Sequence, residues 1–193
     1  MSDFEDDAEL SDWPGLQAAA SFARMVADVA WFDRLGAELE SDEVDWAERY
    51  LAELGFPDVA VSPVADWEEA EAAARNPDWN SDWWEAEEQL RAALLADAVA
   101  KSDEETVMLT LTHVTNRASE AVLLAAEAAA ARFGVEDEAL IRAAAGAATQ
   151  ACYHAALVLA AEADEEHPFA LKYRLYEAGR WPLGVVGRSF NLF

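Results

Sequence analysis

The chain has 193 residues, and its 39 acidic side chains against 13 basic ones give a formal net charge of −26. The length fits one domain with a sizeable core, and the charge disfavours nucleic acid as a partner because phosphate binding depends on a basic surface. Such a surface repels itself at low ionic strength, whereas molar salt shortens the Debye length to about 3 Å. We interpret the composition as adaptation to a salt-rich cytoplasm. The alternative is an acidic mimic of nucleic acid or an acidic partner-binding protein, which predicts acidic residues gathered on one face.

Cysteine content and apolar runs indicate the compartment. Cys152 is the only cysteine, so no internal disulfide forms, in agreement with a reducing interior. The first residues lack the cationic start and the apolar run of a signal peptide. The longest apolar region, 121–131, is interrupted by Glu127 and is shorter than the roughly 20 residues of a membrane span. The sequence therefore predicts a soluble cytoplasmic protein with no membrane partner.

Helical periodicity begins after a strongly acidic start. Residues 1–12 contain six acids and no base, so we expect a flexible tail followed by a single helical domain over 13–193. Apolar residues recur at helical spacing, with Pro, Ser and Asp at expected starts and Gly at expected ends. The expected helices run from Pro14 to about Glu40, from Ser41 or Asp42 to Leu54, from Ser62–Asp66 to near Asn76, from Ser81 past Val99, from Ser102 in a capping box with Glu105 to Phe133, from about Glu136 to Ala163, and from Pro168 to Ala178.

Two segments are predicted to be extended, and one is ambiguous. We expect an extended link at 58–61 and an extended or turn-like tail at 180–193, which contains Pro182, Gly184 and Gly187. Residues 106–112 alternate like a strand, but no segment of similar length offers itself as a pairing partner. The prediction is therefore an all-α bundle of six or seven helices, built around a long antiparallel hairpin over about 103–163, with an extended C-terminal tail.

The hairpin places its few polar residues opposite one another. In an antiparallel pair, residues equally distant from the turn at Phe133–Gly134 lie side by side, and buried polar groups without partners cost roughly 1 to 3 kcal/mol each. Glu127 and Arg142 are therefore a candidate structural ion pair. The candidate ligand-binding residues are His113, Arg117, Glu120, Gln150, Tyr153 and His154. This polar stripe is interpreted either as a network that sets the register of the hairpin or as a small-molecule or anion pocket between the two helices.

Metal and thiol chemistry are the sharper alternatives at the same place. His113, His154 and Glu120 would suit a divalent ion, but the Glu-x-x-His signature of di-iron bundles is absent and His154 points away from the shared face. Cys152 and His154 are two residues apart, so they do not face each other on a helix. We predict no metal, no cofactor and a structural cysteine, and the catalytic residues stay unknown.

The C-terminal segment reverses the charge of the chain. Residues 168–193 carry Lys172, Arg174, Arg180 and Arg188 against the single acid Glu177. These cations either pair with acids of neighbouring helices while Phe190, Leu192 and Phe193 pack on the bundle, or they contact a partner or an anion.

A second cluster is aromatic. Trp67, Trp79, Trp83 and Trp84 are set among acidic residues and either seal a core against water or form a rim for a protein partner. The favoured hypothesis is a non-catalytic binding or protein-interaction protein that self-associates through apolar surface near the tail. Another protein is an alternative partner, and a small molecule is a candidate ligand. The alternative is a small-molecule hydrolase or metal-dependent enzyme that uses His113, Glu120 and His154.

Overall fold

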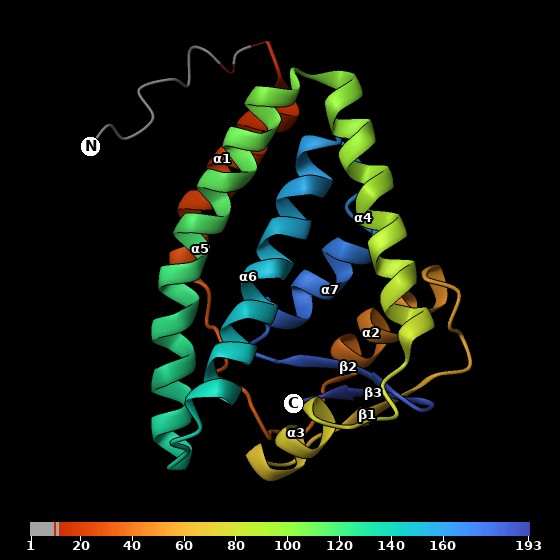
Figure 1. Ribbon diagram of the computed structural model, residues 1–193, viewed down its shortest axis with the longest axis vertical. Coiled ribbons are helices and arrows are strands. Elements are labelled where there is room, and N and C mark those ends of the chain that lie inside the picture. The colour runs from red at the N-terminus through yellow and green to blue at the C-terminus, as the bar shows by residue number, and fades with distance from the viewer. Residues whose placement is uncertain (1–9, 11) are drawn as a thin grey trace.

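The computed structural model describes Leu10 and residues 12–193, and it has the predicted helical architecture (Figure 1). A three-stranded sheet is the addition that the sequence did not predict. The helices are α1 Pro14–Met25, α2 Ser41–Glu53, α3 Trp67–Ala74, α4 Ser81–Lys101, α5 Glu104–Phe133, α6 Glu138–Ala160 and α7 Pro168–Glu177, with a 3-10 turn at Val26–Asp28. The strands are β1 Ala60–Pro63, β2 Pro182–Val186 and β3 Ser189–Leu192.

The hairpin of α5 and α6 is the centre of the fold, as predicted. Gly134 ends α5 in the left-handed conformation (φ 71°), and its N–H donates to the carbonyls of Ala130 and Ala131. Residues 106–112 are helical. In Figure 1, α4 and α5 diverge from their shared connection, α6 and α7 lie between them, and α1 packs behind α5. The hairpin therefore presents one side to α1 and α7, and α4 crosses the other side of α6.

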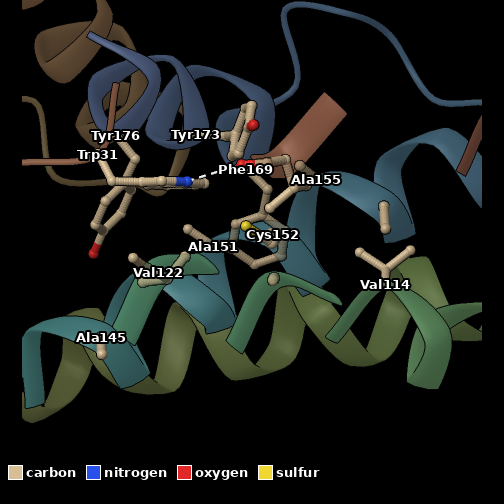
Figure 2. Packing of buried hydrophobic residues seen from close by; sticks show 14 of the residues in the cluster. Trp31, Val114, Val122, Ala145, Ala151, Cys152, Ala155, Phe169, Tyr173 and Tyr176 are labelled. Atoms are coloured by element: carbon tan, nitrogen blue, oxygen red, sulfur yellow. Dashed lines mark hydrogen bonds between the residues drawn. The ribbon is translucent and has the colours of Figure 1, made fainter. Parts of the chain in front are cut away.

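The main core is built from small residues of α5 and α6 and from large aromatic residues around them. Figure 2 shows Cys152 and Ala155 of α6 between Val122 of α5 and the Phe169 and Tyr173 rings of α7. Alanine side chains let the helix backbones approach closely, and the bulky rings fill the remaining space. This division explains why alanine is frequent among the buried residues of α5 and α6.

The C-terminal tail is a β-hairpin. Strands β2 and β3 pair antiparallel, and β1 adds to β3 in parallel, which gives the order β1-β3-β2. The sheet covers a second apolar cluster with Leu51 of α2, Trp83 of α4 and Leu171 of α7. Phe190 and Leu192 belong to this cluster, Phe193 belongs to the main core, and all three are fully buried. The pairing between residues more than a hundred positions apart could not be seen in local patterns.

The first expected helix is wrong beyond Met25. After the 3-10 turn the chain bends, and Phe32 takes a left-handed conformation (φ 59°) that a helix does not contain. The carbonyls of Arg34, Ala37 and Glu38 accept hydrogen bonds from Arg180. A tertiary contact thus satisfies the groups that a longer helix would have used.

Several expected helix starts are shifted. Asn80 rather than Ser81 caps α4, Asp103 rather than Ser102 caps α5, and the Glu43 carboxylate accepts from the Glu40 N–H at the start of α2. Asn and Asp are at least as good caps as Ser, which explains the one-residue shifts. Leu10 is buried in the core, so ordered packing begins inside the expected 1–12 tail; residues 1–9 and 11 lie outside the described residues. Among the described helices, none is long and apolar enough to span a membrane.

Candidate functional site

The polar residues of α5 lie on the outer face of the hairpin. Arg117, Glu120 and Glu127 are exposed, and His113 is half-buried. Arg142 pairs with Glu138 one turn back on α6, with 3.2 Å between Nη1 and Oε2. Within the described residues no ion pair joins Glu127 to Arg142, and both side chains are exposed.

The candidate residues of α6 face α4 and α7 instead of α5. Gln150 is exposed and lines a pocket with Trp84 of α4 and Lys172 of α7. Tyr153 is half-buried beside Arg91 of α4. The structure thus divides the predicted stripe, and its α6 part points to a different neighbour from the one expected.

His154 is the most deeply buried member of the stripe. It is 1 % exposed and stacks on Phe169, with ring centroids 4.0 Å apart and planes 15° from parallel. Neither ring nitrogen has a hydrogen-bond partner in the described part of the chain. Burial, followed by the nearby charges of Lys172 and Arg91, lowers the pKa of His154 well below 6.5, so the ring stays neutral in the folded protein.

A buried carboxylate beside this region joins three helices. Glu87 of α4 is 5 % exposed, and its Oε1 accepts from the Tyr50 hydroxyl of α2 at 2.6 Å and from Lys172 Nζ of α7 at 2.6 Å. The Trp83 indole N–H donates to the Tyr50 oxygen at 2.9 Å. Burial and then the Glu87 carboxylate raise the pKa of Tyr50 well above 10, so its hydroxyl remains a donor.

Lys172, the ion-pair partner of Glu87, also lies beside two aromatic rings. Its ammonium lies 5.2 Å from the centroid of the Trp83 ring and 5.7 Å from that of the Tyr50 ring. Cation–π attraction at such distances adds to the ion pair when both groups are withdrawn from water. For Lys172 the sequence left open a pair with an acid of a neighbouring helix or contact with a partner or an anion, and the structure places it in an internal ion pair that borders on a pocket.

The pocket opens directly beside the Glu87–Lys172 pair. It has a volume of about 190 Å³, and its walls come from α4, α6, α7 and β2. Most of the lining is aromatic or apolar, and three polar side chains reach it. The lining residues are Trp79, Trp83, Trp84, Glu87, Ala147, Gln150, Lys172, Tyr176, Pro182 and Leu183. We call this space the tryptophan pocket.

One atom of the pair has no hydrogen bond to protein. Both hydrogen bonds that Glu87 accepts within the described residues end on Oε1. The buried polar side-chain atoms without a partner there are the Trp67 indole nitrogen and the two ring nitrogens of His154. The Glu87 side chain lines the tryptophan pocket, and its Oε2 accepts no hydrogen bond from the described residues.

The other C-terminal cations are placed differently. Arg180 is fully buried and forms a bidentate pair with Glu43, with Nε–Oε1 at 3.0 Å and Nη2–Oε2 at 2.9 Å. It therefore cannot reach a partner or an external anion in this fold. Arg174 is half-buried and pairs with Glu166 at 3.0 Å, and Arg188 is exposed.

The groups considered for catalysis are not arranged for it. Burial raises the pKa of the Cys152 thiol to about 12, so the thiol stays protonated. Among the described residues no three His, Cys, Asp or Glu side chains form a group that could hold a metal ion, and His113, Glu120 and His154 are not such a group.

Sequence reasoning missed Tyr50, Trp83 and Glu87, although two signals were present. Glu87 lies on the same side of α4 as the buried Leu94 and Ala98, so a charge interrupts an apolar line. Lys172 is one of two lysines and lies between the apolar residues Leu171 and Tyr173. Joining the two signals required the packing of α4 against α7.

No protein-family model matches the chain, and comparison with curated proteins and with solved structures found no significant match.

Proposed function

We propose that this chain is a non-catalytic binding protein of a salt-adapted cytoplasm, and that its ligand site is the tryptophan pocket. One observation carries the proposal: Glu87 lines the pocket beside the buried ammonium of Lys172 and three tryptophans, and its Oε2 accepts no hydrogen bond from the described residues. Concave sites with apolar walls and a few placed polar groups are typical of small-molecule binding.

The exposed tryptophans support this assignment. Trp79 is 47 % exposed and Trp84 is 45 % exposed, whereas Trp67 and Trp83 are buried. Large apolar side chains left open beside a pocket lose hydrophobic free energy in the free protein and regain it when a ligand covers them. The Trp79 and Trp83 rings meet edge to face with centroids 6.3 Å apart, which gives the wall a defined shape.

The enzyme alternative has less support. It needs Glu120, which is exposed on α5, and His154, which is stacked in the core, to act on one substrate. General acid–base catalysis requires both groups within hydrogen-bond reach of the reacting atoms. The tryptophan pocket brings its polar groups together without either residue.

A fragment screen tests the proposal. In about 2 M NaCl, where charge repulsion is screened, a library of small polar fragments should quench tryptophan fluorescence and shift the NMR signals of pocket residues. Trp84→Ala should abolish these responses, and Gln150→Ala should weaken those of fragments that bind its amide group. Two variants serve as matched controls. Met108→Ala changes a side chain that is 46 % exposed, almost the same fraction as Trp84, and Gln89→Ala changes an exposed glutamine on the outside of α4. A screen with no pocket-specific response, or responses equal in the pocket and control variants, would refute a binding role for this pocket.

Salt adaptation has its own test. The 39 acidic residues repel one another when salt is dilute, so the melting temperature should fall as NaCl is lowered from about 2 M to about 0.1 M. The comparison should be repeated with an uncharged osmolyte in place of the salt. Equal melting temperatures at both salt concentrations would contradict this part of the proposal.

Self-association is a second candidate role, favoured by one surface. The expected contact near the tail is not available, because the apolar tail residues are buried. The outer side of α5 instead exposes Leu109, Leu123 and Leu124, at 57 %, 37 % and 61 %. Two copies of α5 packed antiparallel about Asn116 would place Leu109 of one copy near Leu123 and Leu124 of the other. Light scattering should then show a dimer for the wild type and a monomer for the double variant Leu109→Ser, Leu124→Ser. A wild type that is already a monomer would refute this role.

A further inference from the structure

The polar floor of the tryptophan pocket is a dipole rather than a single charge. Glu87 Oε1 and Lys172 Nζ are 2.6 Å apart, and both residues line the pocket. Their formal charges cancel, so a ligand with one net charge is attracted by one group and repelled by the other. A ligand with both charges can lie antiparallel to the pair and satisfy each group with its opposite.

Each end of the dipole has capacity left for a ligand. Glu87 Oε2 has no protein donor within the described residues, while Oε1 accepts two hydrogen bonds. Lys172 donates one described hydrogen bond out of the three that an ammonium can make. Gln150, exposed on the α6 wall, adds an amide group with two further donors.

The walls favour a positive group on the ligand. Trp79, Trp83 and Trp84 present indole rings, whose faces attract cations most strongly among aromatic side chains. The net charge of −26 adds a field that draws cations toward the surface. The ammonium of a ligand would thus meet indole faces and Glu87, and its carboxylate would meet Lys172 and Gln150.

Resting on the proposed binding function of this pocket, we propose that its ligand is a small zwitterion with an ammonium group at one end and a carboxylate at the other. The volume of about 190 Å³ limits the ligand to the size of a small amino acid or its N-methylated derivative.

Charge-matched probes test this assignment in the full chain. Trimethylglycine and alanine carry both charges, choline lacks the carboxylate, and 3,3-dimethylbutyrate replaces the trimethylammonium group of trimethylglycine with an uncharged group of the same shape. Calorimetric titration in about 2 M NaCl should show that at least one zwitterion binds about tenfold or more tightly than either single-charge probe. Gln150→Ala should weaken the zwitterion about tenfold and leave choline unchanged, whereas Gln89→Ala should change neither.

The outcomes separate the ligand class from the existence of the site. If choline or 3,3-dimethylbutyrate binds as tightly as the zwitterions and Trp84→Ala abolishes that binding, the zwitterion assignment is overturned while the pocket remains a binding site. If none of the four probes binds, the assignment is also overturned, and the fragment screen then decides whether the pocket binds anything. Glu87→Gln tests directly whether the ammonium group of the ligand binds the Glu87 carboxylate. Where that variant does not fold, Trp84→Ala and Gln150→Ala, both at exposed positions, still decide the question.

Discussion

Two buried ion pairs hold the C-terminal part of the chain, and they are completed in different ways. Arg180 uses all five of its N–H donors, two on Glu43 and three on the carbonyls of Arg34, Ala37 and Glu38. Lys172 and Glu87 make one contact with each other and leave a carboxylate oxygen without a protein donor in the described part of the chain. Both pairs are withdrawn from water, and the Glu87–Lys172 pair borders on the tryptophan pocket.

The difference separates a structural pair from a candidate site. A buried charge is tolerated when every donor and acceptor is satisfied, and Arg180 meets this condition within the protein. It fastens the 34–38 loop and α2 to the turn before β2, so no capacity remains for a ligand. Glu87 and Lys172 meet the condition only in part, and incomplete satisfaction next to open space is what a binding site requires.

The largest effect is expected from breaking the complete pair. Arg180→Met should cost about 3 to 5 kcal/mol of unfolding free energy, because Glu43 is left buried and unpaired and three carbonyls lose their donor. Chemical denaturation in molar salt measures this loss. Arg188→Met, at an exposed arginine, should change stability by less than about 0.5 kcal/mol. A similarly small loss in Arg180→Met would show that the two pairs do not differ as described.

Breaking the incomplete pair should cost less. Lys172→Met leaves Glu87 with the Tyr50 hydrogen bond and with access to water in the pocket, so we expect a loss of about 1 to 3 kcal/mol. The same denaturation experiment gives the ranking of the two variants. If Lys172→Met is as destabilising as Arg180→Met, the pocket does not hydrate Glu87, and the contrast between the pairs disappears.

A pH titration sharpens the contrast through His154, whose pKa is lowered by burial and then by Lys172, Arg91 and His167. Because the folded pKa lies below the unfolded value of 6.5, the unfolded state binds the proton first as pH falls. Stability is therefore complete above about pH 6.5 and decreases below it, by up to about 1.4 kcal/mol per pH unit. Unfolding free energies between about pH 7.5 and 5.5 should show this decrease, and His154→Leu should remove the His154 part of it.

The charge of Lys172 should be visible in the same titration. Lys172→Met removes one of the repelling charges, so the folded pKa of His154 should rise and the decrease of stability should become smaller. Arg188→Met, whose arginine is not among the causes of the shift, is the control. A pH dependence that is identical in the wild type and in His154→Leu would assign the effect to other groups, such as His167, whose pKa burial also lowers.

The smallest effect on stability is expected at the wall of the pocket. Trp84→Ala removes a side chain that is 45 % exposed, so the unfolding free energy should change by less than about 1 kcal/mol and match that of Met108→Ala. Thermal denaturation of the two variants provides the comparison. A much larger loss in Trp84→Ala would mean that Trp84 supports the fold, and its use as a probe of ligand binding would fail.

Local patterns predicted the helices well and the site poorly. The starts of α1 and α7 at Pro14 and Pro168 and the end of α5 at Gly134 follow from backbone chemistry within a few residues. The helix hairpin was also expected, but side-chain direction was not: Arg117 and Glu120 are exposed on α5, and Gln150 lines a pocket with residues of α4. Opposite positions in two helices do not reveal which face of each one meets the other.

The candidate site itself combines residues that are far apart in sequence. Tyr50, Glu87 and Lys172 lie on three helices, and each one alone resembles an ordinary polar residue in an amphipathic helix. The acidic composition also made these residues hard to recognise in the sequence, since most charged residues of this chain lie at the surface.

The sequence by itself determined the helical class, the end of the long hairpin and the acidic surface, because backbone propensity, capping and net charge act over a few residues or over the whole composition. Only the tertiary structure decided that the tail pairs with residues 60–63, that Arg180 binds the carbonyls of the 34–38 loop, and that Glu87 meets Lys172. Buried charges and strand pairing depend on which distant groups come close enough to replace water, and that is a property of the packed molecule.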